Sequence, residues 1–137
     1  MKKFEFLEHT ADVKFKAFGK SLEKVFENSA LAMINIMTSQ RIKKKIKKTI
    51  IIKGKDFESL MYNFLEEILF IMDTEAFVLA SVRKLKIDKE NFELKAELVG
   101  DSPKKYEFHL DIKAITYNEM FVREENKKWV AQVVLDV

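Results

Sequence analysis

The spacing of hydrophobic and polar residues changes period several times along the chain. Over residues 4–7 and 12–18, apolar residues largely alternate with charged ones. A period of two is typical of strands with one buried face. We therefore expect a strand over each range, with Gly19 ending the second one.

Two longer segments follow the helical period instead. Ser21 is a good N-cap for a helix whose apolar face continues to Met37. Asp56 is placed to cap a second helix, whose apolar row runs from Phe57 to Met72. The second segment becomes apolar almost all round towards its end, which predicts a helix in the core.

The remaining predicted elements are strands joined mostly by short turns. Their ranges are 46–53, 77–87, 92–99, 111–117, 120–124 and 129–136, with turns at 88–91, near 118–119 and at 125–128, and a break at 100–103. Short connections favour antiparallel pairing. We therefore predict an α+β fold: a single two-layer domain over residues 1–137, with a largely antiparallel mixed sheet and both helices packed on one face.

Composition adds limits to this picture. At 137 residues and 47% hydrophobic, the chain has the size of one domain with a substantial core. The absence of cysteine excludes disulfides and thiolate chemistry. Acidic residues interrupt the basic start of the chain, and no apolar run is long enough for a membrane span. We expect a cytoplasmic protein that does not enter a membrane.

Charge is distributed unevenly along the chain. The formal net charge is only +3, yet residues 41–55 contain eight Lys and Arg residues and no acid. Such a run could contact phosphates. Lysines that alternate with isoleucines also serve to keep an edge strand solvated and free of aggregation. Both interpretations stay open on the sequence.

Common catalytic signatures are missing, and three glycines cannot form a glycine-rich phosphate loop. The notable polar groups lie near the two ends. Asp136 is followed directly by Val137, so its carboxylate would stand beside that of the chain terminus. If Asp12 lies next to them, three oxygen donors converge, as Mg²⁺, Ca²⁺ or Mn²⁺ would require. Alternatively, Asp12 closes a turn and Asp136 is simply solvated.

Other candidates are less specific. His9 fits a packed or capping histidine as well as a ligand. Lys113 and Tyr117 share one face of a predicted strand. They could bind a phosphate or a partner protein, or they could be ordinary surface residues of the strand. Residues 73–75, with two acids, extend an acidic patch or form the exit loop of a helix.

Several segments together resemble one known family, the archeases. They are Phe6-Leu7-Glu8-His9-Thr10-Ala11-Asp12, Gly19-Lys20-Ser21-Leu22-Glu23 leading into residues 26–33, Met72-Asp73-Thr74-Glu75, Lys113-Ala114-Ile115-Thr116-Tyr117, and Trp129 to Val137. Each segment is weak as a motif. Their common order and spacing make the resemblance specific, and it covers the whole chain.

The resemblance implies an accessory protein, not an enzyme in its own right. Archeases activate the GTP-dependent tRNA-splicing RNA ligase by promoting guanylylation of its active-site histidine, and so meet tRNA indirectly. The family binds a divalent cation, assigned as calcium, and the matching residues here are Asp12, Asp136 and Val137. Mg²⁺ or Mn²⁺ are alternatives. His9 and Lys113 are candidates for ligase contact. Many members have histidine where this chain has Asn118.

Two other functions compete with this one. The first is an RNA-binding module that uses the basic segment 41–55. Such a module would bind tRNA without the help of the ligase, and its affinity would depend strongly on salt concentration. The second is a metal-dependent phosphohydrolase. The sequence offers carboxylates for it but no recognisable pair of nucleophile and base.

Overall fold

The computed structural model describes residues 1–8 and 12–137. Within them the chain forms seven strands, two long helices and a short 3₁₀ helix. In chain order these are β1 (Phe4–Leu7), β2 (Val13–Gly19), α1 (Leu22–Met37), β3 (Ile46–Lys53), α2 (Phe57–Thr74), β4 (Val78–Asp88), β5 (Glu93–Asp101), η1 (Pro103–Lys105), β6 (Ala114–Glu125) and β7 (Lys128–Asp136).

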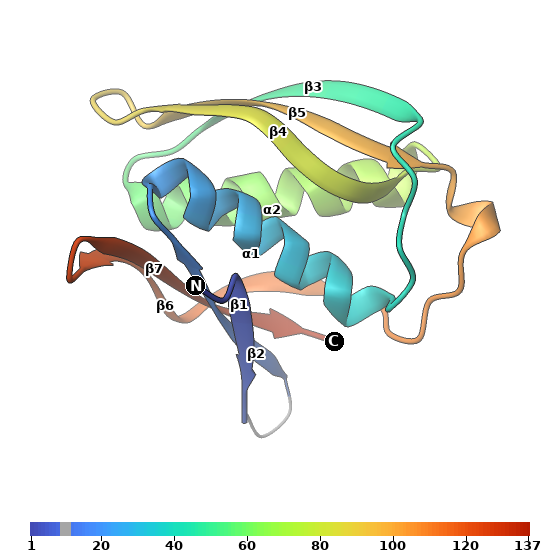
Figure 1. Ribbon diagram of the computed structural model, residues 1–137, viewed down its shortest axis with the longest axis horizontal. Helices are drawn as coiled ribbons and strands as arrows, with labels where there is room; N and C mark the ends of the chain where they lie inside the picture. Colours follow the sequence, from blue (N-terminus) through green and yellow to red (C-terminus); the bar gives the residue numbers. More distant parts are fainter. Residues whose placement is uncertain (9–11) are drawn as a thin grey trace.

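The strands divide into two antiparallel sheets. One has the order β1-β2-β7-β6 and the other the order β3-β5-β4. Both helices lie between the sheets (Figure 1), where α1 packs mainly on β2 and β4, and α2 mainly on β6. The predicted α+β class is confirmed. The structure differs from the expected single sheet because strand pairing depends on long-range contacts, which the alternating pattern does not encode.

Local chemistry explains where the helices begin. The Ser21 hydroxyl accepts a hydrogen bond from the Lys24 N–H at 3.1 Å, which caps α1 as predicted. At α2, Asp56 accepts from the Ser59 N–H at 2.7 Å, and the Ser59 hydroxyl accepts in return from the Asp56 N–H at 3.1 Å. This reciprocal capping box satisfies two backbone donors that a helix start otherwise leaves unpaired.

The core fills the space between the sheets and around both helices. The rings of Phe26 from α1 and Phe64 from α2 pack against each other at 5.7 Å between centroids, and both side chains are fully buried. Trp129 is half-buried and meets Phe57 edge to face at 5.7 Å between ring centroids. Neither helix in the described ranges is long and apolar enough to cross a membrane.

Two predicted boundaries need correction. The break expected at 100–103 begins later, because β5 continues through Gly100 to Asp101. The strands expected at 111–117 and 120–124 are replaced by one strand, β6, which begins only at Ala114 and has an irregular register between Thr116 and Phe121. Polar residues such as Asn118 and Glu119 suit a bulge as well as a turn, so the pattern alone did not separate the two.

Candidate functional site

Three strands bring the predicted metal residues to one end of the first sheet. In the pairing of β2 with β7, Val13 lies opposite Leu135, so Asp12 and Asp136 each come one position beyond this pair. Figure 1 shows the C-terminal end of β7 close to the start of β2. The register thus brings Asp12 together with the adjacent residues Asp136 and Val137, far from it in sequence. They lie at the same edge of the sheet, the one where the ends of these strands meet.

The third strand fixes the backbone at this edge. Ala114 of β6 lies opposite Asp136, and the Lys113 N–H donates to the Asp136 carbonyl oxygen at 2.8 Å. The Lys113 side chain is exposed. It is therefore available to a partner molecule, while its backbone holds Asp136 in place.

The environment of this edge is partly apolar. Asp12, Asp136 and Val137 are all half-buried, and Val137 packs against the core. In the described part of the chain, no lysine or arginine forms an ion pair with the Asp136 carboxylate. Half-burial weakens hydration of a carboxylate, so a charge in this position gains from a bound cation.

The oxygen donors at this edge are of the chemical type that binds hard divalent cations. Side-chain carboxylates of Asp12 and Asp136 and main-chain oxygen at Val137 are the donors that Ca²⁺ and Mg²⁺ prefer. However, no group of three His, Asp or Glu side chains within the described ranges is placed to hold a metal ion. A cation here would need main-chain oxygens and water, and its binding stays a prediction.

Two of the other candidates have different outcomes. His9 lies outside the described residues, with Thr10 and Ala11, so its predicted contact with a partner stays untested. Tyr117 stacks flat on Tyr62 of α2, with centroids 4.2 Å apart and an interplanar angle of 6°. Its ring therefore packs on the helix, although 54% of the residue stays exposed.

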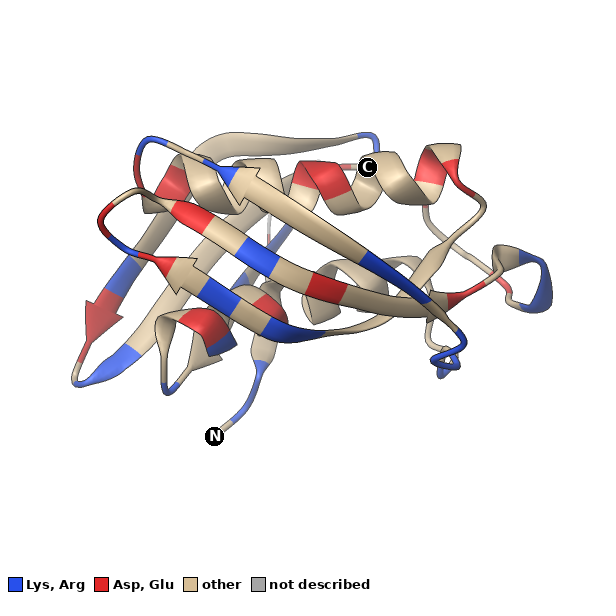
Figure 2. Cartoon of the chain, turned by 90° about the horizontal axis from the view of Figure 1, so that it is seen from above, with Lys and Arg blue, Asp and Glu red and all other residues tan. Residues whose placement is uncertain are grey.

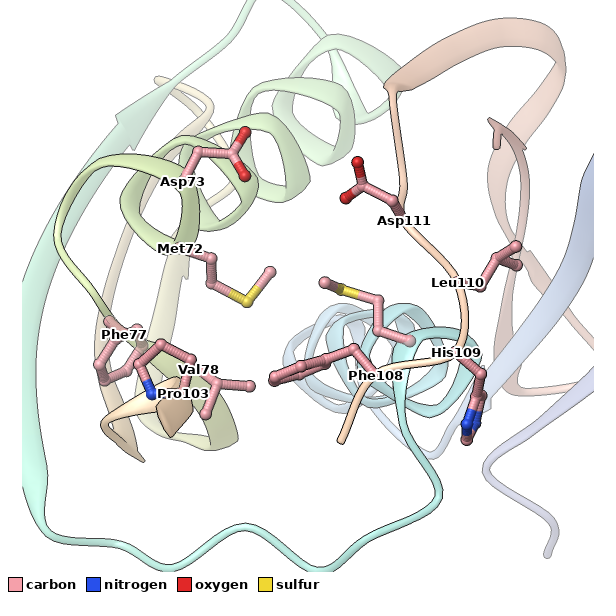
Figure 3. A pocket seen from close by; sticks show the side chains of 10 residues that line it. Met72, Asp73, Phe77, Val78, Pro103, Phe108, His109, Leu110 and Asp111 are labelled. Atoms are coloured by element: carbon pink, nitrogen blue, oxygen red, sulfur yellow. The ribbon is translucent and has the colours of Figure 1, made fainter. Parts of the chain in front are cut away.

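A cavity of about 480 Å³ lies beside this edge, where the ends of both helices meet the segment that leads into β6. Met37, Met72 and Phe108 supply much of its apolar lining, and the exposed carboxylates of Asp73 and Asp111 point towards each other across it (Figure 3). Sequence reasoning missed the cavity, because its walls come from separate elements with no shared motif.

The acidic stretch at the C-terminal end of α2, residues 73–75, is split between two environments. Asp73 faces the cavity, whereas the Glu75 carboxylate accepts a hydrogen bond from Lys48 at 2.7 Å. The Thr74 hydroxyl donates to the Phe70 carbonyl oxygen at 2.7 Å, as expected for the last turn of a helix. The predicted exit loop therefore begins too early, because α2 includes Asp73 and Thr74 and only Glu75 follows it as the C-cap.

The basic run also divides into two parts. On β3, Lys47, Lys48 and Lys53 form ion pairs with Glu97, Glu75 and Glu93 at 3.7, 2.7 and 3.9 Å. These pairs agree with a solvated strand face whose charge is balanced. The preceding loop, residues 41–45, carries exposed cations that have no such pairs among the described residues.

Comparison with known proteins gives one consistent answer. A family model described as the Archease protein family matches residues 4–137. The protein archease of Methanosarcina barkeri is 38% identical over 99% of this chain and 97% of its own length. That of Pyrococcus abyssi is also 38% identical, and the match covers both chains completely.

Solved structures show the same fold. The solution structure of Methanobacterium thermoautotrophicum protein 1598 matches with a TM-score of 0.85 at 36% identity, over all of both chains. A Thermotoga maritima crystal structure, described as an archease and possible chaperone, matches with a TM-score of 0.68 over 96% of this chain and 94% of its own. At 19% identity, the second comparison supports the fold alone.

Proposed function

Since the chain belongs to the archease family, we propose that it is an accessory protein of a GTP-dependent tRNA-splicing RNA ligase. It would work in the cytoplasm, bind the ligase and promote guanylylation of the ligase's active-site histidine, so that the ligase completes many turnovers. In this proposal the protein performs no reaction alone and meets tRNA through the ligase.

The meeting of β2, β6 and β7 at one sheet edge is the observation that carries this proposal. Two half-buried carboxylates and the end of β7 share this edge, and the Lys113 N–H holds the backbone of Asp136 at 2.8 Å. Backbone pairing of β7 with β2 and β6 would keep this edge in shape when it enters a partner's nucleotide pocket. Preorganised groups lose little entropy on binding.

Asp12, Asp136 and the main-chain oxygen of Val137 would hold a divalent cation, Ca²⁺, Mg²⁺ or Mn²⁺, against the nucleotide. When bound, the cation supplies positive charge to the pyrophosphate that leaves during guanylyl transfer. The role of the chain is to position the carboxylates. Lys113 and His9 would contact the ligase beside them.

The first test is a time course of ligase guanylylation with GTP and no RNA. Asp12→Asn and Asp136→Asn keep the side-chain size but remove the negative charge. We expect each variant to slow guanylylation by at least about tenfold, the lower end of losses seen when a metal site is disturbed. Unchanged acceleration by both variants would contradict the proposal.

A matched control separates this effect from a general loss of charge. Glu124 is exposed and lies at the far end of β6 from Lys113. Glu124→Gln should activate the ligase normally. Calorimetric titration with Ca²⁺ gives a second readout, because both aspartate variants should lose heat of binding that the control retains. Hydrolysis of GTP by the protein alone would instead support an enzyme.

A further inference from the structure

Two loops meet at the end of the second sheet to form a surface rich in lysine. The first, residues 38–45, follows α1, and the second, residues 102–109, follows β5. The Lys45 N–H donates to the Gly100 carbonyl oxygen at 2.7 Å, and the Lys43 N–H donates to the Tyr106 hydroxyl at 3.0 Å. The His109 N–H also donates to the Met37 carbonyl oxygen at 3.0 Å. The bond between Lys43 and Tyr106 joins the two loops, and the other two bonds attach them to β5 and α1.

We define the loop cluster as the six cationic residues on these loops. All six are exposed, and none forms an ion pair with another described residue; they are Arg41, Lys43, Lys44, Lys45, Lys104 and Lys105. Figure 2 shows these basic loops at one end of the sheet, whereas the strands carry basic and acidic positions side by side. The loop cluster is therefore a local excess of positive charge.

Repulsion between the positive charges of the loop cluster is only partly relieved. The ammonium group of Lys105 neighbours that of Lys45 and, with help from Lys43, lowers the pKa of Lys45. Asp101 is the acid that opposes this effect. Its carboxylate is only 3% exposed and accepts hydrogen bonds from the Tyr106 hydroxyl and the Ser102 N–H. An external anion would thus relieve repulsion that the described residues leave in place.

We propose that the loop cluster binds the phosphodiester backbone of RNA. Its cations follow two exposed loops, and Arg41 and Lys44 also line a second hollow, of about 380 Å³, together with Lys3. A row of separate charges suits the repeating phosphates of a polymer better than the single phosphate group of a small molecule. The choice of RNA as the polymer rests on the proposed function, since a ligase partner would bring RNA to this surface.

The proposal also narrows the sequence-based expectation for segment 41–55. Lys47, Lys48 and Lys53 are paired with glutamates, so the strand lysines are not the principal contacts. Lys104 and Lys105, which lie far along the chain, take their place. Only the fold brings these residues beside Lys43 and Lys45.

Fluorescence anisotropy with a labelled single-stranded oligouridine tests the proposal on the full chain. The test variant is Lys45→Gln/Lys105→Gln, which replaces two exposed lysines of the loop cluster. The control is Lys86→Gln/Lys95→Gln, which replaces two lysines that are also exposed and lie opposite each other on β4 and β5. The two variants carry the same net charge.

We expect wild-type binding to weaken steeply with salt. For the loop variant, the slope of log K against log salt should become shallower by about 1.4, since each single-strand phosphate contact contributes roughly 0.7. The control should keep the wild-type slope. Equal losses in both variants, or no salt-dependent binding by the wild type, would overturn the proposal. Competition by GTP as effective as by unlabelled RNA would also overturn it.

A guanylylation time course without RNA keeps this proposal separate from the previous one. The loop variant should promote guanylylation like the wild type, whereas Asp136→Asn should bind the oligouridine like the wild type. If the wild type activates the ligase normally but does not bind RNA, only the RNA-binding proposal is contradicted. If the wild type binds RNA normally but does not activate the ligase, only the proposed role in ligase activation is contradicted.

Discussion

The buried carboxylate of Asp101 connects the two basic loops through a chain of hydrogen bonds. It accepts from the Tyr106 hydroxyl at 2.7 Å and from the Ser102 N–H at 2.8 Å. The same Tyr106 hydroxyl accepts from the Lys43 N–H at 3.0 Å. The hydrogen bond from Tyr106, followed by that from Ser102 and the positive charges of Lys105 and Lys45, lowers the pKa of Asp101.

A lowered carboxyl pKa makes part of the stability depend on pH. The contribution is fully present above the unfolded-state pKa of about 4 and is lost as pH falls through the lower folded-state pKa. Asp101→Asn should therefore unfold more easily than wild type at neutral pH, and the difference should shrink in acid. Urea unfolding over a pH series measures it.

A second variant checks the cause. Tyr106→Phe removes the donor but keeps the ring, so it should reproduce part of the same pH dependence. A difference between wild type and Asp101→Asn that stays constant from neutral pH to below about pH 4 would rule out this account.

At the scale of the element, α2 shows what periodicity can and cannot predict. Its apolar row correctly indicated a core helix, and Phe64 is 0% exposed. Phe70 belongs to the stretch that seemed apolar all round, yet it is 58% exposed. Whether a residue of such a stretch is covered depends on neighbouring elements, and these lie elsewhere in the sequence.

The two phenylalanines give a matched comparison within one helix. Phe64→Ala should lower the free energy of unfolding by about 3–5 kcal/mol, because it leaves a cavity against Phe26. Phe70→Ala should change it by less than about 0.5 kcal/mol, since its ring is mostly in water. Chemical denaturation of both variants provides the measurement, and similar losses would contradict the described orientation of α2.

The strand β6 illustrates a different limit. Its polar middle predicted a turn, but the chain continues as one strand with an irregular register between Thr116 and Phe121. The side-chain amide of Gln132 donates to the Glu119 carbonyl oxygen at 2.8 Å, and Lys14 pairs with Glu119 at 3.2 Å. Partners from β7 and β2 thus stabilise a bulge that local sequence could not distinguish from a turn.

At the scale of the whole molecule, the two sheets enclose both helices, and distant segments form each candidate surface. Residue patterns located most elements and flagged Asp12, Asp136 and Val137 individually. The edge that they share depends on β7 lying between β2 and β6. The loop cluster likewise depends on hydrogen bonds between loops about sixty residues apart, such as that from Lys43 to Tyr106. Local hydrophobic periodicity does not predict such long-range pairing.

The sheet orders predict how backbone amides are protected across the molecule. Strand β7 is bonded on both sides, and Val133 and Leu135 in it are fully buried, whereas β1 is an edge strand of four residues. Hydrogen exchange should be slowest in β7 and in β5, the centre of the other sheet, and much faster in β1. Amides of β7 that exchange as quickly as those of β1 would contradict the strand order.

The central place of β7 has a consequence for the order in which the protein is made. A ribosome produces β7 after all the other described strands, yet β7 must lie between β2 and β6. A nascent chain that lacks residues 128–136 therefore leaves β6 without a partner strand and β2 paired with β1 alone. The edge that carries Asp12 and Asp136 can therefore form only after residues 128–136 have left the ribosomal exit tunnel.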